Sequence, residues 1–340
     1  MLFIFGDSYL DVGNNNYLNT STLNQANFWP YGETFFGFPT GRFSDGRLIS
    51  DFICEYAGLP LIQPYLHPWT HEWSVGANFA SAGAGALVGT FQGYVIDLRT
   101  QLGFFKKMET QLRQELGDEE AEGRLSQAVY LFSIGTNDYT SLFLTNSSHL
   151  HSTSTSRLDY VGMVVGNVTS IIQEIYERGG GRKFAFLNLP PLGCLPGIRV
   201  LRPEAKGSCL EEASLLANLH NQALSWLLAK LEDKLQGFKY SLFDTNTFLR
   251  QMMDHPSKYA LSEGRVACCG TGEFRGVYSC GGKRIVKDFK LCDDPSQNLF
   301  WDSYHPTEAA NEVIADRIWN GDPDHLIVRP YSLKQLFSTR

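Results

Sequence analysis

Near its start the sequence reads Leu2-Phe3-Ile4-Phe5-Gly6-Asp7-Ser8. A short apolar run that ends in glycine and polar residues is typical of a buried strand. Similar runs lie at Val129–Ile134, Lys183–Leu187 and Tyr240–Phe243, and Ala77–Ala80 is a weaker candidate. Because these runs are continuously apolar rather than alternating, they predict strands of a mostly parallel sheet that is covered on both faces.

Segments with helical periodicity separate these strands. We expect helices at Leu48–Tyr56, Leu102–Leu116, Leu158–Tyr176, Leu210–Leu235 and Thr307–Trp319. Strands that alternate with helices predict an α/β fold. The segment Asn14–Gly46 is rich in Asn, Gly, Pro and aromatic residues. We expect it to wrap the surface near the end of the first strand.

The composition is that of a chain with a sizeable core. Hydrophobic residues make up 43% of the 340 residues and charged residues 19%, a balance that argues against disorder. The net charge is -7, and lysine and arginine occur without a basic run, so nothing favours binding to nucleic acid or to a charged membrane surface. No apolar stretch reaches the ~18 residues of a membrane span, so no transmembrane segment is expected.

The beginning of the sequence carries no signal peptide, because a basic region, an apolar region and a cleavage site are all missing. Either the protein is cytosolic or its leader is absent from this sequence. Asn-x-Ser/Thr sequons at Asn19, Asn146 and Asn167 favour the second interpretation and predict N-linked glycans. We therefore expect a secreted, extracellular protein.

The cysteines support the same expectation. Four of the seven lie at Cys268, Cys269, Cys280 and Cys292, which predicts a disulfide-stapled loop, and the alternative of a zinc site lacks the paired C-x-x-C spacing. Adjacent Cys268 and Cys269 are not expected to bond to each other, so two connectivities remain open. We expect Cys194 to pair with Cys209, and Cys54 to be a buried free thiol.

Two polar clusters with small residues follow predicted strands. Ser8 lies just past the first strand, where Gly6 permits a tight turn and a serine would project over the sheet edge. The alternative is that Ser8 caps a helix. In Asn78–Gly85 the small residues let the backbone approach a ligand and point an N–H group at an oxyanion. A plain flexible turn is the alternative there, and the spacing does not match a dinucleotide-binding loop.

Two further clusters carry the remaining chemistry. In Ser133–Asp138 the Asn137 amide could donate to an oxyanion, although an Asx-turn or a helix cap is the alternative. In Trp301–Thr307, His305 is a candidate general base and Asp302 lies three residues before it, placed to hold the imidazole. The alternative is that Asp302 caps the last helix and His305 lies on the surface. Together the clusters predict a serine esterase.

With these motifs the sequence closely resembles the plant GDSL esterase/lipase family of the SGNH hydrolases. Its blocks are similar to Phe5-Gly6-Asp7-Ser8, Asn78–Gly85, Ile134–Asp138 and Asp302-Ser303-Tyr304-His305-Pro306. The resemblance runs from residue 2 to about residue 337 and implies a single domain over residues 1–340. It implies a three-layer α/β/α sandwich with a flavodoxin-like sheet, no metal and no organic cofactor.

The resemblance also assigns roles to residues. It implies a triad of Ser8, Asp302 and His305, and an oxyanion hole made by Ser8, Gly83 and Asn137. One departure is Tyr9, which stands where the family motif has leucine. That position flanks the nucleophile, so we expect it to affect the wall of the acyl pocket rather than catalysis. Asn27-Phe28-Trp29-Pro30-Tyr31-Gly32 is similar to a segment of plant lipases linked to pathogen defence.

The function implied is hydrolysis of a small-molecule acyl ester through these residues. Two alternatives stay open. An acyltransferase would use the same triad with an alcohol in place of water. A catalytically silent secreted binding protein would keep the fold without the chemistry, but all four clusters are intact.

Overall fold

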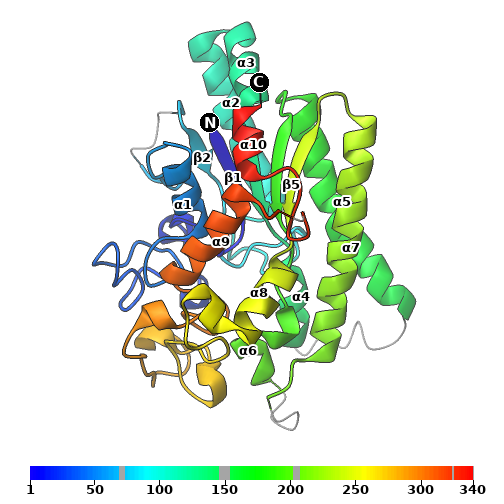
Figure 1. Ribbon diagram of the computed structural model, residues 1–340. Helices are drawn as coiled ribbons and strands as arrows, with labels where there is room; N and C mark the ends of the chain where they lie inside the picture. Colours follow the sequence, from blue (N-terminus) through cyan, green and yellow to red (C-terminus); the bar gives the residue numbers. More distant parts are fainter. Residues whose placement is uncertain (69–72, 145–153, 202–206, 324, 340) are drawn as a thin grey trace.

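The computed structural model describes residues 1–68, 73–144, 154–201, 207–323 and 325–339 (Figure 1). It is built on a six-stranded sheet with the order β2-β1-β3-β4-β5-β6. The strands are β1 (Leu2–Gly6), β2 (Gly76–Asn78), β3 (Val129–Ser133), β4 (Lys183–Leu187), β5 (Lys239–Phe243) and β6 (Val328–Pro330). All neighbouring pairs are parallel except β5 and β6, which are antiparallel. The prediction of a mostly parallel sheet is confirmed.

Helices cover both faces of this sheet (Figure 1). One group of contacting helices consists of α1 (Ile49–Tyr56), α9 (Glu308–Asn320) and α10 (Leu333–Ser338). The other consists of α2 (Leu98–Leu116), α5 (Ser154–Glu177) and α7 (Glu211–Lys234). The shorter helices are α3 (Asp118–Gln127), α4 (Thr136–Leu144), α6 (Pro196–Arg199) and α8 (Thr245–Asp254). The expected three-layer α/β/α sandwich is therefore the observed fold.

The predicted elements differ from the observed ones mainly at their ends. The weak strand candidate Ala77–Ala80 is a strand over Gly76–Asn78, because the Asn78 side chain accepts a hydrogen bond from the Ala80 N–H at 3.0 Å and turns the chain. Helix α2 starts four residues before its predicted start, since the Asp97 carboxylate caps it. Strand β6 was missed: it has only three residues, and one of them is a proline.

Helices α3, α4, α6, α8 and α10 were also absent from the prediction, because each is short and offers only a brief apolar pattern.

Close packing of β1 against β3 sets the edge where the candidate site lies. The rings of Phe5 and Phe132 stack with centroids 4.9 Å apart, and Phe132 stacks in turn on Phe186 at 5.3 Å. At Gly6 the backbone has φ +153°, and a Cβ there would lie only 2.3 Å from the Ser133 carbonyl oxygen. Only glycine fits this approach, which brings the carboxyl ends of β1 and β3 together.

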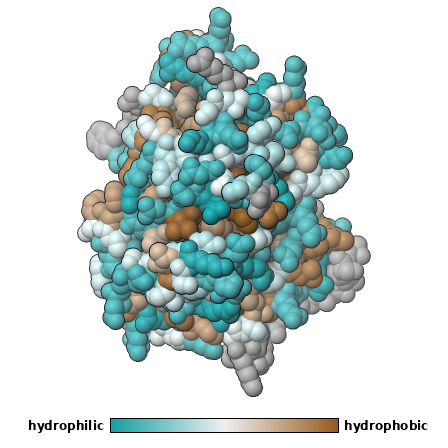
Figure 2. Space-filling model, viewed as in Figure 1, coloured by the Kyte–Doolittle hydropathy of each residue, from teal (hydrophilic) through white to brown (hydrophobic). Residues whose placement is uncertain are grey.

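On the face shown in Figure 2 most of the surface is hydrophilic, and the hydrophobic residues form small patches between hydrophilic ones. The large hydrophobic side chains lie mostly in the interior, where they form two clusters. Among the helices of the described residues, none has the length and apolar character needed to cross a membrane.

The segment Asn14–Gly46 wraps the surface only in part, because several of its residues are buried. Tyr31 and Phe43 within it are buried, with 0% and 1% exposure. The Asn14 side chain donates hydrogen bonds to the carbonyl oxygens of Asn78 and Ala80, at 2.9 and 2.8 Å. These bonds draw the segment into the protein, where its aromatic residues fill a second apolar cluster.

The disulfides agree with the expected pattern. Cys194 pairs with Cys209, and the four clustered cysteines form the bridges Cys268–Cys292 and Cys269–Cys280. This settles which of the two open connectivities holds. Cys54 is a buried free thiol, as predicted. Across the residues that the structure describes, no group of three or more His, Cys, Asp or Glu side chains could hold a metal ion.

Replacing Cys269 and Cys280 together by serine should lower the free energy of unfolding by about 3 kcal/mol, because the unfolded chain loses a covalent constraint. Urea unfolding of the oxidised proteins measures this difference. Cys54→Ala is the matched control, since it removes a buried thiol that forms no bridge. A double variant that is as stable as this control would contradict a stabilising role for the bridge.

Candidate active site

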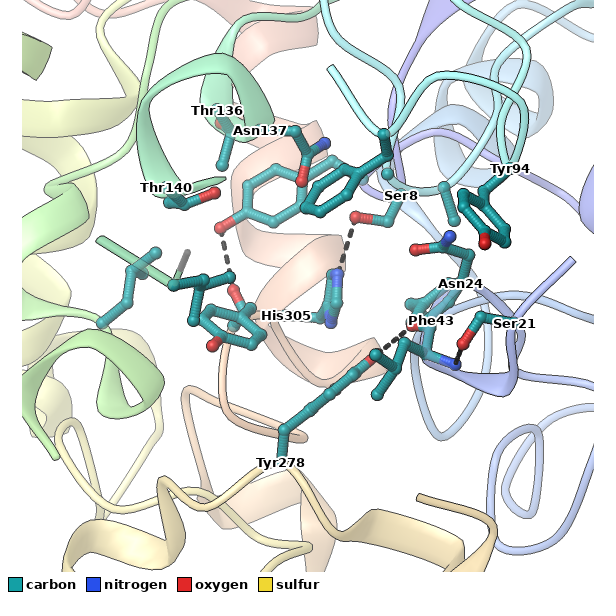
Figure 3. Close-up of a pocket in the computed structure, with 18 of the residues that line it drawn as sticks. Ser8, Ser21, Asn24, Phe43, Tyr94, Thr136, Asn137, Thr140, Tyr278 and His305 are labelled. Carbon is teal, nitrogen blue, oxygen red and sulfur yellow. Dashed lines mark hydrogen bonds between the residues drawn. The ribbon is translucent and has the colours of Figure 1, made fainter. Parts of the chain in front are cut away.

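Ser8, His305 and Asp302 form one continuous hydrogen-bonded set. Ser8 lies two residues past the end of β1, and its Oγ lies 2.7 Å from His305 Nε2, as the dashed line in Figure 3 marks. His305 Nδ1 lies 2.7 Å from Asp302 Oδ1. The carboxylate favours the tautomer with the proton on Nδ1, so that Nε2 can accept from the serine hydroxyl. The structure thus brings together the three residues that the sequence placed in one triad.

The segment that carries Asp302 and His305 is a tight turn rather than a helix start. The Trp301 N–H donates to the His305 carbonyl at 2.7 Å and closes the turn. Helix α9 is capped by Thr307, so the alternative that Asp302 caps this helix does not hold. His305 is only 5% exposed, which also excludes the alternative of a surface histidine.

Asp302 is buried, and donors occupy both of its oxygens. Oδ1 accepts from His305 Nδ1 and from the backbone N–H groups of Tyr304 and His305, at 2.9 and 3.0 Å. Oδ2 accepts from the Tyr31 hydroxyl at 2.7 Å. Burial acts to raise the pKa of Asp302, but His305 and these donors outweigh it and hold the pKa below its usual value. The carboxylate therefore stays charged.

Gly83 and Asn137 lie beside Ser8 in the wall of one cavity; Asn137 and Ser8 are labelled in Figure 3. Gly83 has φ +84°, a conformation that favours glycine. Within the described residues, neither the Ser8 N–H nor the Gly83 N–H has a hydrogen-bond acceptor. Asn137 Nδ2 donates to the Ala84 carbonyl at 2.9 Å, which leaves its second N–H for another acceptor.

Two buried carboxylates hold the loop that carries Gly83. Asp11 Oδ2 accepts from the Ala82 N–H at 2.9 Å, on one side of Gly83. On the other side, Asp138 accepts from the N–H groups of Ala86 and Leu87, at 2.8 and 3.0 Å. Burial raises the pKa of both Asp11 and Asp138 to about 6, against the effect of these donors. The loop conformation is thus fixed from both sides.

The cavity has a volume of about 730 Å³ and is lined mostly by apolar and aromatic side chains. Tyr9 forms part of its wall, at the position where the sequence departs from the GDSL motif. Its hydroxyl donates to the Tyr304 carbonyl at 3.0 Å, and its ring meets His305 edge-on at 5.8 Å. Tyr278 lies on the opposite side of His305 from Asn137 in Figure 3.

Residues around the site that the sequence did not single out include Asp11, Asp138, Tyr31, Arg284 and His220. Buried His220 in α7 lies 2.9 Å from the Tyr139 hydroxyl, beneath the turn that leads to Asn137. Burial lowers the pKa of His220 to about 3, so its ring is neutral. Asp138 adjoins Asn137 and Tyr31 lies in a quoted motif, but no local pattern points to Arg284 or His220.

A three-layer sandwich with a hydrogen-bonded Ser-His-Asp set at the carboxyl edge of its sheet has the organisation of a serine hydrolase. The chain belongs to the GDSL-like lipase/acylhydrolase family, whose family model matches residues 2–318. By that membership it is a carboxylic-ester hydrolase.

Relatives match nearly the whole chain. It is 58% identical to GDSL esterase/lipase 5 of Arabidopsis thaliana, over 99% of this chain and 87% of that protein. It is 50% identical to GDSL esterase/lipase 1 of the same plant, over 99% of this chain and 89% of that protein. It is 47% identical to a GDSL lipase of Tanacetum cinerariifolium, over 99% of this chain and 87% of that protein.

Asp7→Asn should stabilise the protein increasingly as the pH rises. Asp7 is 1% exposed, and in the described part of the chain its Oδ2 has no partner. Burial raises the pKa of Asp7 to about 7 from its ordinary 3.8, so the folded protein loses stability as the pH rises through that window. Asparagine has no charge to bury and keeps an acceptor for the Tyr9 N–H, which Asp7 binds at 3.1 Å.

The gain in the free energy of unfolding should grow by roughly 2 kcal/mol between pH 5 and pH 8. Urea unfolding of both proteins at the two pH values measures it. Asp233→Asn, which changes an exposed carboxylate in α7, is the control and should show no such growth. A gain for Asp7→Asn that does not change with pH would show that Asp7 is not protonated near neutrality.

Proposed function

We propose that the protein hydrolyses acyl esters with Ser8 as nucleophile, His305 as general base and Asp302 as the residue that orients His305. One observation carries the proposal: the unbroken hydrogen bonds from Ser8 Oγ through His305 to Asp302, at the wall of an apolar cavity. Ser8 Oγ attacks the ester carbonyl while His305 Nε2 takes its proton. Asp302 stabilises the imidazolium that forms.

In this proposal the oxyanion of the tetrahedral intermediate is bound by the backbone N–H groups of Ser8 and Gly83 and by Asn137 Nδ2. Support comes from the two N–H groups that have no acceptor in the described residues, and from the second N–H of the Asn137 amide. Such donors stabilise charge that develops only in the transition state. His305 then gives its proton to the leaving alcohol, and water releases the acid from Ser8 with His305 again as base.

The lining of the cavity supports a substrate with an apolar acyl group. A panel of esters with graded acyl length, assayed beside Ser8→Ala, identifies the acyl groups that are accepted. Adding a competing alcohol separates a hydrolase from an acyltransferase: a transferase forms the new ester, and a hydrolase forms only the acid. A binding protein without activity would fail to react with a fluorophosphonate probe.

We also propose that the protein is secreted and that residues 1–340 form one domain. The three disulfides support an oxidising compartment. Of the predicted glycan sites, Asn19 is exposed and Asn167 is partly exposed, while Asn146 lies outside the described residues. The single sheet that takes strands from Leu2 to Pro330 supports the one-domain proposal.

Ser8→Ala should abolish ester hydrolysis and change the free energy of unfolding by no more than about 1 kcal/mol, because the hydroxyl contributes little packing. Ester turnover and thermal unfolding of the purified variant measure the two effects. Turnover equal to that of the wild type would exclude Ser8 as the nucleophile.

Asn137→Ala should lower kcat by roughly 10²- to 10³-fold, the usual effect of losing one oxyanion donor. KM should change little, because the donor acts on the charge that develops in the transition state. Steady-state kinetics with a chromogenic ester measures both constants. Asn320→Ala, at the exposed end of α9, is the control for loss of an asparagine amide. A variant in which only KM rises would place Asn137 in substrate binding instead.

A further inference from the structure

Arg284 is a buried cation without a paired anion. Its side chain is 1% exposed, and within the described residues no salt bridge involves it. Nη2 donates to the Tyr31 hydroxyl oxygen at 3.2 Å, while Nε and Nη1 have no partner there. Its guanidinium lies over the rings of Tyr278, Phe28, Tyr31 and Phe43, at 4.2, 4.9, 5.8 and 6.0 Å from their centroids.

Burying a charge in this way is costly unless something offsets it. The aromatic faces offset part of the cost. The nearest anion along the hydrogen bonds of Arg284 is Asp302, whose Oδ2 accepts from the Tyr31 hydroxyl at 2.7 Å. A single series of contacts therefore runs from Arg284 through Tyr31, Asp302 and His305 to Ser8.

We propose that Tyr31 and Arg284 are positioning residues of the triad: the Tyr31 hydroxyl fixes the second oxygen of Asp302, and Arg284 supplies the counter-charge for its carboxylate. This inference rests on the proposed function, because it assigns a role relative to His305 as the base.

The first part of the argument is orientation. All three donors other than Tyr31 lie on Asp302 Oδ1, so the Tyr31 hydroxyl is the donor that holds Oδ2. Without it, a buried carboxylate oxygen would lose its hydrogen bond, and the carboxylate would be held at one oxygen only. Because Asp302 orients the imidazole, a change in its plane moves His305 Nε2 relative to Ser8.

The second part is charge. The groups that face Asp302 are Tyr9, Tyr31, Tyr278, Arg284, Tyr304 and His305. Of these, Arg284 is the permanent cation. Its donation to the phenol oxygen makes the Tyr31 O–H a stronger donor, and its charge moderates the negative field at His305. Arg284 therefore limits how strongly Asp302 stabilises the imidazolium that forms when His305 takes the Ser8 proton.

A role for Arg284 in binding an anionic ligand fits the structure less well. Its unpartnered nitrogens are fully buried, and Arg284 does not line the cavity, although the next two residues, Ile285 and Val286, do. The guanidinium faces the aromatic rings and Tyr31 rather than the space where a substrate would lie. Its contacts thus point toward the triad.

The experiment compares pH profiles of kcat/KM for the wild type, Tyr31→Phe, Arg284→Met and Arg284→Lys. In Tyr31→Phe and Arg284→Met the acid limb should move to higher pH by roughly half to one unit, since the imidazolium is better stabilised. In both, kcat should fall roughly ten- to hundredfold with KM little changed. Arg284→Lys keeps the charge and should return the acid limb toward its wild-type position.

Tyr130→Phe is the matched control, because it removes another buried phenol hydroxyl, which donates to the Leu125 carbonyl at 3.0 Å away from the cavity. Its acid limb should stay at the wild-type pH. If Arg284→Met fails to fold, the pH profile and kcat of the isosteric Tyr31→Phe still test the proposal. A folded Tyr31→Phe with a wild-type acid limb and wild-type kcat would overturn the proposal.

A second readout does not depend on turnover. The His305 Nδ1 proton in its hydrogen bond to Asp302 gives a low-field proton NMR signal, which should shift in Tyr31→Phe and not in Tyr130→Phe. An unshifted signal would count against positioning by Tyr31. Ser8→Ala, measured in the same assays, separates the two proposals. If Ser8→Ala turns over ester as fast as the wild type, the proposed function is overturned. If turnover depends on Ser8 but the pH profile of Tyr31→Phe is unshifted, only this inference is overturned.

Discussion

The contact of Gly6 with the Ser133 carbonyl is the constraint on which the site depends. Two parallel strands end at the same level there, because no side chain separates them at Gly6. Ser8 leaves one strand and α4, with Asn137, follows the other. A side chain at this point would push β1 and β3 apart at the edge where the proposed nucleophile and the proposed oxyanion donor share one cavity. The chemistry therefore depends on backbone packing in the sheet.

Around that edge the protein uses charges in two different ways. Asp11 and Asp138 bind backbone N–H groups, and burial favours their neutral forms near pH 6. Asp302 is equally buried but stays ionised, because His305 and donors at both oxygens surround it. Aspartate thus has two roles here: Asp11 and Asp138 hold a loop through backbone hydrogen bonds, and Asp302 is a permanent anion. What distinguishes Asp302 is its interaction with the His305 side chain, which favours the ionised carboxylate.

The sequence predicted the sheet apart from β6, the main helices and the Cys194–Cys209 pair, because apolar runs and cysteine spacing are local signals. It left two connectivities open for the other four paired cysteines. It also predicted that Asp302 and His305 act together, since they are three residues apart. The sequence did not identify Tyr31 and Arg284 as parts of the site. Their contacts join residues separated by 271 and 253 positions, and no local pattern encodes such a contact. The burial of Tyr31 and Phe43 within Asn14–Gly46 was missed for the same reason.

The separation of Ser8 and His305 has a consequence for biosynthesis. They are 297 residues apart in the chain, so the ribosome makes the proposed nucleophile long before the proposed base. A nascent polypeptide that has already paired β1, β3 and β4 still carries an unactivated serine. The proposed triad can assemble only after His305 has been synthesised, so products truncated before this residue lack the triad even where most of their sheet can form.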